Sequence, residues 1–504
     1  MEIYWIAMVY CLQWQNLLAL VTGGIYGVIV GILPGIGPAV GMALALPLTL
    51  KWHPAAALIF LCTSYKLSTY GGSITSIVLN TPGDSSNAAT VIDGFPMCRK
   101  GEGGIALGAS CASAVVGGLL GTLGLIFFSP ALARFALRFG PAEYCLIGVF
   151  ALTLVSVAIR GSVVRGLISA GLGLILATFG YDAVVGTLRF TFGMDFLGDG
   201  VPVIQAMVGL FGVAQALELA ESNEPLSRVG SLMGGVWEGF KKYFHYPYNI
   251  LRSTFIGLFV GVVPAVGQTI SGFLSYMEAV RESKHPETFG KGEIEGVIAP
   301  ETANNACMPG DLVCTISLGI PGSVGAAVFL GSMVIFGITP GPLVFKEHGD
   351  IIYTLFMSLL FAHGLIFIIG LTSFRYFARI ATIPNVIIVP TILTISLIGS
   401  YATRNMMIDV IISLVFGFLG YFMNKINFSP IPLIFGLVIG DMIEKNFHRA
   451  LLLSEGAYRI FIESWEAKLL LVLIFLSLFW LPLHRRFWPI GTAVKKILHL
   501  INHG

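Results

Sequence analysis

Two polar interruptions of apolar sequence contain residue types that bind small ions. The first reads N-T-P-G-D-S-S-N over residues 80–87. A helix should end before Pro82, because proline lacks an N–H and disfavours the helical conformation of the residue before it. Gly83 permits a sharp reversal, and the polar residues after it are good N-caps for a second helix. The pattern therefore predicts a helix–turn–helix hairpin near residues 70–90.

The tip of such a hairpin can bind ions of either sign. Unpaired N–H groups at the start of the second helix attract an anion, whereas the last carbonyl groups of the first helix coordinate a cation. The side chains of Asn80 and Thr81 add uncharged donors and acceptors. For residues 85–87, helix capping and ligand contact are equally good explanations. Asp84 would repel a bound organic anion, so it is better suited to capping a helix or to binding a cation.

A second segment repeats this turn as L-G-I-P-G-S over residues 318–323. It keeps the proline, the glycine and a serine cap but has no polar side chains just before the proline, so we expect its backbone to make most contacts. Asn304 and Asn305 precede it and are candidates for ligand contact or for helix capping. The two acids of this approach, Glu301 and Asp311, would bind a cation or lie at a hydrated helix end.

Few basic residues lie near either segment. Lys66 is the only lysine or arginine between residues 54 and 98, and residues 292–345 contain none. An anionic ligand would therefore be held largely by amides, hydroxyls and co-bound cations. Lys66 itself either pairs with a carboxylate or extends toward the membrane interface, as lysines near helix ends often do.

These considerations define two overlapping sets of candidate residues. The candidates for substrate binding are Lys66, Ser73, Asn80, Thr81, Pro82, Gly83, Ser85, Ser86, Asn87, Asn304, Asn305, Pro321, Gly322 and Ser323. The candidates for cation binding are Asn80, Thr81, Asp84, Thr302, Thr315 and Gly319.

The helices that position these residues are expected to lie in a membrane. Of the 504 residues, 56% are hydrophobic and 11% are charged, whereas a soluble domain usually carries about 25% charge. A mean hydropathy of +0.85 is too high for a chain that must hide its apolar residues in a soluble core. With about 20 apolar residues per crossing, the length allows about 10 to 14 membrane segments. We predict an all-α polytopic membrane protein with broken helices.

Composition also excludes several other classes of protein. The net charge of +2, without a basic stripe, argues against a nucleic-acid partner. The seven cysteines contain no C-x-x-C pair, which argues against a disulfide framework or a zinc site. We therefore expect no cofactor and no enzyme activity.

The two halves of the chain resemble each other. The pattern G-x3-G-x2-P-x2-G of residues 27–37 recurs at residues 257–267. We interpret it as small-residue helix packing with a proline break, and a hinge or a wall of the cavity is the alternative. The segments around Pro82 and Pro321 also match, 239 residues apart. Paired Gly/Pro-interrupted segments in two halves indicate the binding site of a transporter. Whether the halves are inverted depends on the number of crossings between them, which the broken segments leave open.

This repeat defines the expected organisation of the chain. The predicted parts are a first membrane repeat at residues 1–219 with its hairpin near 70–90, a hydrophilic linker at 220–249, a second membrane repeat at 250–484 with its hairpin near 305–335, and a basic tail at 485–504.

Two alternative functions remain from the residues alone. An intramembrane aspartyl enzyme would use Asp84 and Asp311 as carboxylates that share a proton, but Asp84 aligns with Ser323 in the repeat, so the two P-G-D triplets occupy unrelated positions. A passive carboxylate channel is the other, although two occluding hairpins suit alternating access better than an open pore.

At these residues the chain resembles the large membrane subunit of the tripartite tricarboxylate transporters, the TctA type. The matching motifs are G-I-L-P-G-I-G-P (31–38), Y-G-G-S-I-T-S-I-V-L-N-T-P-G-D (70–84), D-G-F-P-M (93–97), R-F-T-F-G (189–193), P-E-T-A-N-N-A (300–306), L-G-I-P-G-S (318–323) and G-I-T-P-G-P (337–342). They extend through most of the chain in the expected order.

The resemblance implies a secondary transporter that imports di- or tricarboxylates, such as citrate-like anions, across the bacterial inner membrane. It implies coupling to a sodium or proton gradient, a small TctB-like membrane subunit, and a periplasmic TctC-like binding protein that delivers the substrate. Similarity to other hairpin-bearing carboxylate transporters suggests inverted repeats and an elevator-like movement. Family members tend to have a small residue where Lys66 stands. This difference either argues against a shared role for this lysine or indicates an altered preference for substrate charge.

Overall fold

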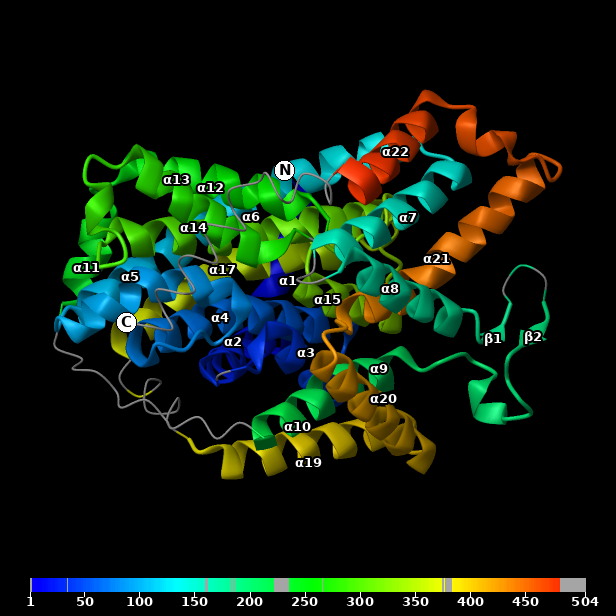
Figure 1. Ribbon diagram of the computed structural model, residues 1–504, viewed down its shortest axis with the longest axis horizontal. Helices are drawn as coiled ribbons and strands as arrows, with labels where there is room; N and C mark the ends of the chain where they lie inside the picture. Colours follow the sequence, from blue (N-terminus) through cyan, green and yellow to red (C-terminus); the bar gives the residue numbers. More distant parts are fainter. Residues whose placement is uncertain are drawn as a thin grey trace. The chain divides into compact units, whose positions relative to one another are not determined.

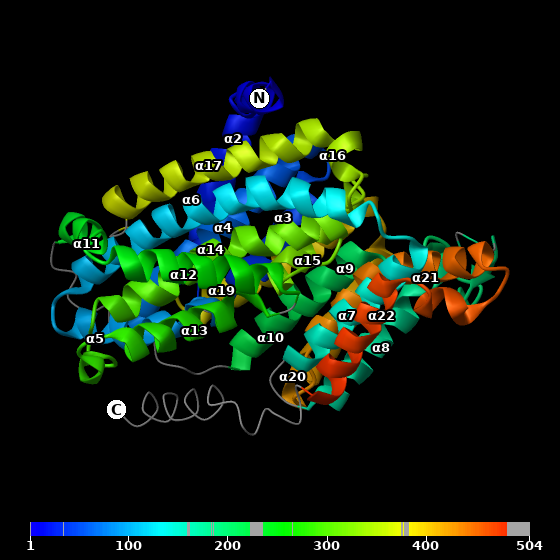
Figure 2. The ribbon, with the colours of Figure 1, turned by 90° about the horizontal axis from the view of Figure 1, so that it is seen from above.

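The computed structural model describes residues 2–33, 35–158, 162–182, 184, 186–221, 235–264, 266–373, 376 and 383–480 (Figures 1 and 2). The chain forms two compact units. The first unit comprises Met1–Ala133 with Met207–Phe418, and the second comprises Arg134–Ala206 with Leu419–Gly504. Pro34, residues 222–234 of the expected linker and the expected basic tail lie outside the described residues.

The described part of the chain is built almost entirely from helices. The α-helices are α1 (Glu2–Cys11), α2 (Trp14–Ile32), α3 (Gly37–Thr49), α4 (Pro54–Leu79), α5 (Ala88–Arg99), α6 (Gly103–Ala136), α7 (Pro141–Ala158), α8 (Val163–Ala177), α9 (Val203–Met207), α10 (Ala214–Glu221), α11 (Val236–Tyr243), α12 (Pro247–Val262), α13 (Gly267–Glu282), α14 (Glu295–Leu318), α15 (Val324–Ile335), α16 (Val344–Glu347), α17 (Gly349–Thr372), α19 (Asn385–Arg404), α20 (Met407–Lys425), α21 (Ile431–Leu453) and α22 (Trp465–Phe475). Short 3₁₀ or π segments are η1 (Ser85–Asn87), η2 (Asp195–Leu197), η3 (Val208–Val213), η4 (Pro286–Thr288), η5 (Tyr458–Ile462) and η6 (Leu476–Trp480), and the strands are β1 (Gly180–Tyr181) and β2 (Leu188–Arg189).

Within the described residues, six helices are long and apolar enough to cross a membrane. They are Trp14–Ile32, Gly103–Ala136, Val203–Glu221, Gly349–Thr372, Asn385–Arg404 and Met407–Lys425. Shorter apolar helices, which include α3, α8 and α15, accompany them. The prediction of an all-α, multi-pass membrane protein is confirmed, whereas the number of crossings stays a prediction.

Helices α4 and α14 are the central helices of the first unit, and both are buried along almost their whole length. Helix α2 packs along α4, and α12 packs along α14 (Figure 1). Glycines permit this close approach. A Cβ on Gly27 would lie 2.4 Å from the carbonyl oxygen of Ser64, and a Cβ on Gly257 would lie 2.3 Å from that of Ala303. The glycine patterns of the sequence therefore act as small-residue packing, as predicted.

Helix α13 lies beside α12, as Figure 2 shows, and also packs against α5. The carboxylate of Asp93, in the D-G-F-P-M motif on α5, is fully buried and ties α5 to the segment before α14. Its Oδ1 accepts hydrogen bonds from the backbone N–H groups of Gly292 and Glu293, both at 2.8 Å. Its Oδ2 accepts one from the hydroxyl of Tyr276 on α13, also at 2.8 Å. One motif residue therefore holds three segments together.

In the second unit α21 packs against α7 and α8, and the antiparallel strands β1 and β2 form a small hairpin. Arg189 on β2 donates to Glu444 Oε1 at 2.7 Å and to Oε2 at 3.0 Å, and its Nη1 lies 3.1 Å from Asp182. The hydrogen bond with Glu444 raises the pKa of the arginine above its ordinary value. His448 completes a cluster with the two acids. Because the guanidinium already binds both carboxylates, the cluster acts as an ion-pair clamp between the hairpin and α21.

Candidate functional site

The first predicted hairpin is present, with α4 as its first arm and η1 followed by α5 as its second. Asn80 caps α4 in the left-handed conformation, with φ 58° and ψ 18°, which asparagine tolerates better than most residues. Asp84 caps η1, because its Oδ2 accepts from the backbone N–H of Ser86 at 3.0 Å. Asn80 and Ser85 are exposed, and Thr81 is half-buried, so this tip presents polar groups at an accessible surface.

The second predicted hairpin is also present, with α14 and α15 as its arms. Gly319 caps α14 in the left-handed conformation, with φ 73° and ψ 25°. Ser323 caps α15, because its Oγ accepts from the backbone N–H of Ala326 at 3.2 Å. Residues 319–322, which include Pro321, are buried. The second tip is therefore closed where the first is accessible.

The two tips have the same backbone arrangement at positions 239 residues apart. Asn80 corresponds to Gly319, and the cap residue Asp84 corresponds to Ser323. The turn glycines also agree. A Cβ on Gly83 would lie 2.2 Å from a carbonyl oxygen of α2, and a Cβ on Gly322 would lie 2.8 Å from one of α12. Each turn thus packs against the glycine-rich helix of its own half of the sequence.

Each tip also receives side chains from the other half of the sequence. At the first tip, the hydroxyl of Thr269 on α13 lies 3.1 Å from that of Ser85. At the second tip, the hydroxyl of Tyr65 on α4 lies 2.8 Å from Ser323 Oγ. The same hydroxyl oxygen lies 3.2 Å from Asp311 Oδ2 and 3.3 Å from Gln268 Oε1, both of which are acceptors. Residues from both halves therefore form each site.

Lys66 is fully buried and does not extend to an interface. Its ammonium donates to Asn305 twice, to the backbone oxygen at 3.0 Å and to the side-chain Oδ1 at 2.8 Å. Asn305 in turn donates to the carbonyl oxygen of Glu301 at 2.9 Å. His363 is a further neighbour, since a Cβ on Gly118 would meet both the lysine Nζ and the imidazole. Lys66 thus joins α4 to α14 inside the protein.

The carboxylate of Glu301 is fully buried among hydroxyl groups. It accepts hydrogen bonds from Ser73 at 2.7 Å, from Thr90 at 2.5 Å and from Ser110 at 3.2 Å. Asn87 donates to Ser73 Oγ at 2.9 Å. Two residues assigned to the substrate set, Ser73 and Asn87, therefore belong to a polar network between the hairpin arms, and their direct contact with substrate stays a prediction.

Asn304 differs from the other polar residues of α14. Its side chain is buried, with 1% of its surface exposed, and neither Oδ1 nor Nδ2 has a hydrogen-bond partner in the described part of the chain. Buried amides are normally satisfied, because each unpaired group costs about 1–3 kcal/mol. An unpaired buried amide beside a hairpin is the feature expected of a ligand contact.

The remaining candidates have partners within the protein. The hydroxyl of Thr315 donates to the carbonyl oxygen of Asp311 at 2.6 Å, and that of Thr302 lies 3.3 Å from Tyr243 Oη. Thr81 Oγ1 donates to the carbonyl oxygen of Leu79 at 3.2 Å, and Ser86 Oγ lies 3.5 Å from Asn87 Oδ1. Their roles in binding stay predictions.

Sequence reasoning missed several residues of this region, namely Tyr65, Thr90, Ser110, Gln268 and His363. A signal existed for one of them. Tyr65 stands 239 residues before Asn304, so the repeat placed it opposite a residue already selected.

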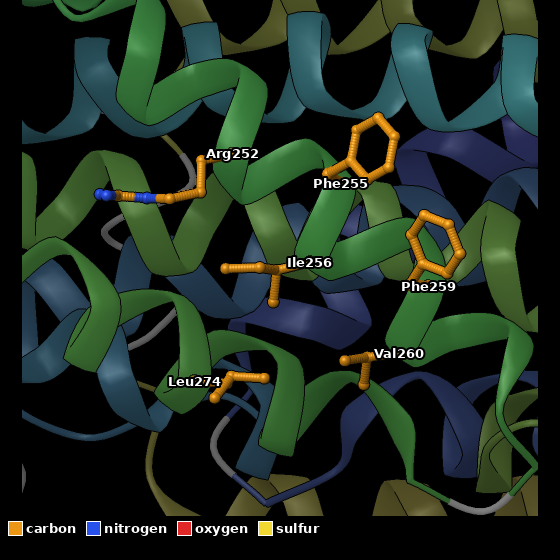
Figure 3. Close-up of a pocket in the computed structure, with 6 residues that line it drawn as sticks. All are labelled: Arg252, Phe255, Ile256, Phe259, Val260 and Leu274. Atoms are coloured by element: carbon orange, nitrogen blue, oxygen red, sulfur yellow. The ribbon is translucent and has the colours of Figure 1, made fainter.

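An apolar pocket lies elsewhere, on α12 and α13 (Figure 3). It is lined by Arg252, Phe255, Ile256, Phe259, Val260 and Leu274. The rings of Phe255 and Phe259 stack at 5.1 Å, and the guanidinium of Arg252 lies over the ring of Tyr248. Such walls suit hydrocarbon better than a multiply charged anion, so the hairpin tips are the stronger candidates for a carboxylate site.

The chain is also similar in sequence to known proteins. Residues 17–435 match the family described as the tripartite tricarboxylate transporter TctA family. Two proteins of Agrobacterium vitis are similar to the chain. An uncharacterized 52.8 kDa protein in the TAR-I ttuC' 3'region is 35% identical over 427 residues, which cover 84% of this chain and 85% of that protein. An uncharacterized protein in the TAR-II ttuC' 3'region is 34% identical over 215 residues, covering 43% of this chain and 89% of that protein.

No solved structure matches the chain. The family match covers both hairpins and all seven motifs on which the resemblance was based. The chain therefore belongs to the tripartite tricarboxylate transporter TctA family.

Proposed function

We propose that this chain is the large membrane subunit of a secondary transporter that imports a di- or tricarboxylate across the bacterial inner membrane. The driving force is a sodium or proton gradient. A small TctB-like membrane subunit and a periplasmic TctC-like binding protein complete the system. The family match supports the transporter class, and the unpaired buried amide of Asn304 is the observation that supports a polar ligand next to the hairpins.

We further propose that the two halves are inverted structural repeats. The matched caps of the two hairpins support this, because both first helices end in a left-handed residue and both second helices begin at an extended cap. The contact between Lys66 and Asn305 also supports it, since these residues stand 239 positions apart and meet each other. Equivalent residues meet in this way when a pseudo-two-fold axis passes between them.

The substrate binds at the first tip in this proposal. Asn80 and Ser85 are exposed there, and Thr81 between them is half-buried. The one lysine of the region, Lys66, is already bound to Asn305. The carboxylates of the substrate are therefore held by amides and hydroxyls, as the scarcity of basic residues predicts.

Alternating access by an elevator-like movement fits the arrangement better than a passive channel. The central helices α4 and α14 are buried along almost their whole length, and the second tip is closed. An aspartyl enzyme is a weaker candidate, because Asp84 caps a helix while Asp311 contacts Tyr65 at the other tip. The chain's family is one of transporters, which also argues against catalysis.

The test is uptake of labelled carboxylates by cells that express the chain with its two partner subunits, with and without an imposed sodium or proton gradient. Citrate, tartrate and succinate are suitable probes. We expect saturable uptake that depends on one of the gradients and accumulates substrate above its external concentration. Uptake that equilibrates without accumulation would support a channel, and no gradient-dependent uptake of any carboxylate would disprove the proposal.

Two glycine substitutions locate the site within that assay. Asn80→Gly removes the amide but keeps the left-handed cap, as Gly319 does at the second tip. Asn405→Gly is the matched control, because Asn405 caps α19 with φ 55°. Loss of a hydrogen bond to a charged ligand costs about 1.5–3 kcal/mol, so Asn80→Gly should raise KM by about 10- to 150-fold while the control stays unchanged. Equal KM values for both variants would show that the substrate does not bind at the first tip.

A further inference from the structure

Four side-chain oxygens converge at the second hairpin tip. Three of them, Ser323 Oγ, Asp311 Oδ2 and Gln268 Oε1, lie 2.8, 3.2 and 3.3 Å from the Tyr65 hydroxyl oxygen. They come from the α15 cap, α14, α13 and α4. The tyrosine has one hydrogen to share among three neighbours. The Nε2 of Gln268 faces the carbonyl oxygen of Asn304 at 3.5 Å, so its Oε1 is the atom turned toward the cluster.

The negative charge of this cluster is not balanced by a basic residue in the described part of the chain. Asp311 is fully buried, and its Oδ1 accepts a hydrogen bond from the thiol of Cys307 at 3.6 Å. Glu301, the other buried acid of α14, provides a contrast, because Lys66 lies close to it and is joined to it through Asn305. A buried carboxylate without a cation is costly, so Asp311 requires a positive partner from outside the protein.

The two hairpins also differ at these positions. Gly72 stands 239 residues before Asp311 in the first half, so the acid is present at one tip only. Tyr65 corresponds to Asn304 in the same way. The hydroxyl of Tyr65 contacts the second tip, whereas the side-chain amide of Asn304 has no hydrogen-bond partner in the described part of the chain. The second tip therefore offers a carboxylate and neutral oxygens, while the first offers amides and hydroxyls.

We propose that Asp311, Tyr65, Gln268 and Ser323 form a binding site for a monovalent metal cation of the size of sodium. Hard cations take carboxylate, amide and hydroxyl oxygens as ligands. Two oxygens at right angles around an ion, each about 2.4 Å from it, are about 3.4 Å apart, close to the separations in this cluster. A proton would need only one oxygen, so the convergence of four favours a metal ion.

This site deepens the proposed transport function, on which its role as coupling site rests. Ser323 begins α15, Asp311 lies on α14, and Tyr65 belongs to α4. A cation that binds all three holds the second hairpin against the central helix of the other half. Its release allows the tip to separate from α4. Cation binding is thereby linked to the closure of a hairpin.

The test measures cation binding directly, without transport. The purified full-length chain in detergent is heated in increasing NaCl, with choline chloride keeping the ionic strength constant, and its Tm is recorded at several pH values. We expect the Tm of the wild-type chain to rise and saturate with sodium, because a ligand that binds only the folded state stabilises it. In Asp311→Asn, which keeps the size of the side chain, the half-saturating sodium concentration should rise at least tenfold.

Glu301→Gln is the matched control, since it neutralises the other buried acid of the same helix. It should keep the wild-type half-saturating concentration. Gln268→Met is a second variant, which removes one oxygen and keeps the acid, and it should weaken sodium binding several-fold even if Asp311→Asn does not fold. The proposal is overturned if the wild-type Tm does not depend on sodium, if it depends on pH alone, or if Gln268→Met or Asp311→Asn keeps the wild-type sodium response.

The outcome is separable from that of the transport assay. Sodium binding through Asp311 in a chain that takes up no carboxylate would retain this site and disprove the proposed function. Gradient-driven uptake by a chain whose Tm does not depend on sodium would support the proposed function and disprove the cation site.

Discussion

Replacement of Asn304 by leucine should make the protein more stable and less active. The side-chain Oδ1 and Nδ2 are buried and have no hydrogen-bond partner in the described part of the chain. An unpaired buried polar group costs about 1–3 kcal/mol, and an apolar side chain of the same shape removes that cost. Leucine is close to asparagine in size, so we expect a gain of about 2 kcal/mol in the substrate-free protein.

The neighbouring residue provides the matched control. Asn305 uses both ends of its amide, because Lys66 donates to its Oδ1 at 2.8 Å and its Nδ2 donates to the Glu301 carbonyl at 2.9 Å. Asn305→Leu removes one of the two partners that hold the buried ammonium. Hydrogen bonds to charged groups contribute about 1.5–3 kcal/mol, so this variant should lose about 2 kcal/mol.

The assay is thermal unfolding in detergent together with carboxylate uptake. Unfolding entropy of about 2.1 cal/mol/K per residue over 504 residues converts 2 kcal/mol into about 2 °C. We therefore expect the Tm of Asn304→Leu to rise by about 2 °C and that of Asn305→Leu to fall by about 2 °C. Uptake by Asn304→Leu should be lost despite its higher Tm. A lower Tm with normal uptake would refute the reasoning, since it would show that Asn304 is a structural residue.

Two further predictions concern the packing of the first unit. A Cβ on Gly31 would lie 2.0 Å from the carbonyl oxygen of Ser68, so Gly31→Ala should separate α2 from α4 and lower the stability by about 1–3 kcal/mol. In the control Gly364→Ala the new Cβ would have nothing within 4 Å, so the stability should rise by about 0.5–1 kcal/mol. Equal Tm values for the two variants would contradict this prediction. The carboxylate of Asp93 accepts hydrogen bonds from three donors, and Asp93→Asn would turn an N–H₂ group toward at least one of them. This variant should lose about 2–3 kcal/mol of stability. Proteolysis between α13 and α14 should also become faster. If the variant resists proteolysis as well as the wild-type chain does, the carboxylate does not hold this segment in place.

Local chemistry explains why the hairpins were predictable. A proline followed by glycine and by serine or aspartate ends one helix and begins another through interactions within a few residues. Asn80 and Gly319 therefore end α4 and α14, and Asp84 and Ser323 begin the next segments. The membrane class followed from composition, because it depends on how much apolar surface the chain has rather than on how the chain folds.

The partners of the polar side chains could not be predicted in this way. The sequence left Lys66 with two roles, pairing with a carboxylate or extending to an interface, and it grouped Ser73 and Asn87 with a hairpin tip. In the structure Lys66 binds Asn305, 239 residues away, and Ser73 donates to Glu301, 228 residues away. These choices depend on which helices pack together across the repeat.

The sequence by itself determined the membrane class, the family, and the position of both hairpins, because each is encoded in composition or in a short run of residues. Only the tertiary structure decided which charges are balanced. It placed Lys66 near Glu301, left Asp311 among neutral oxygens, and left the amide of Asn304 without a partner. The physical reason is that a buried charge or amide is satisfied by whatever the packing of distant helices brings within about 3 Å.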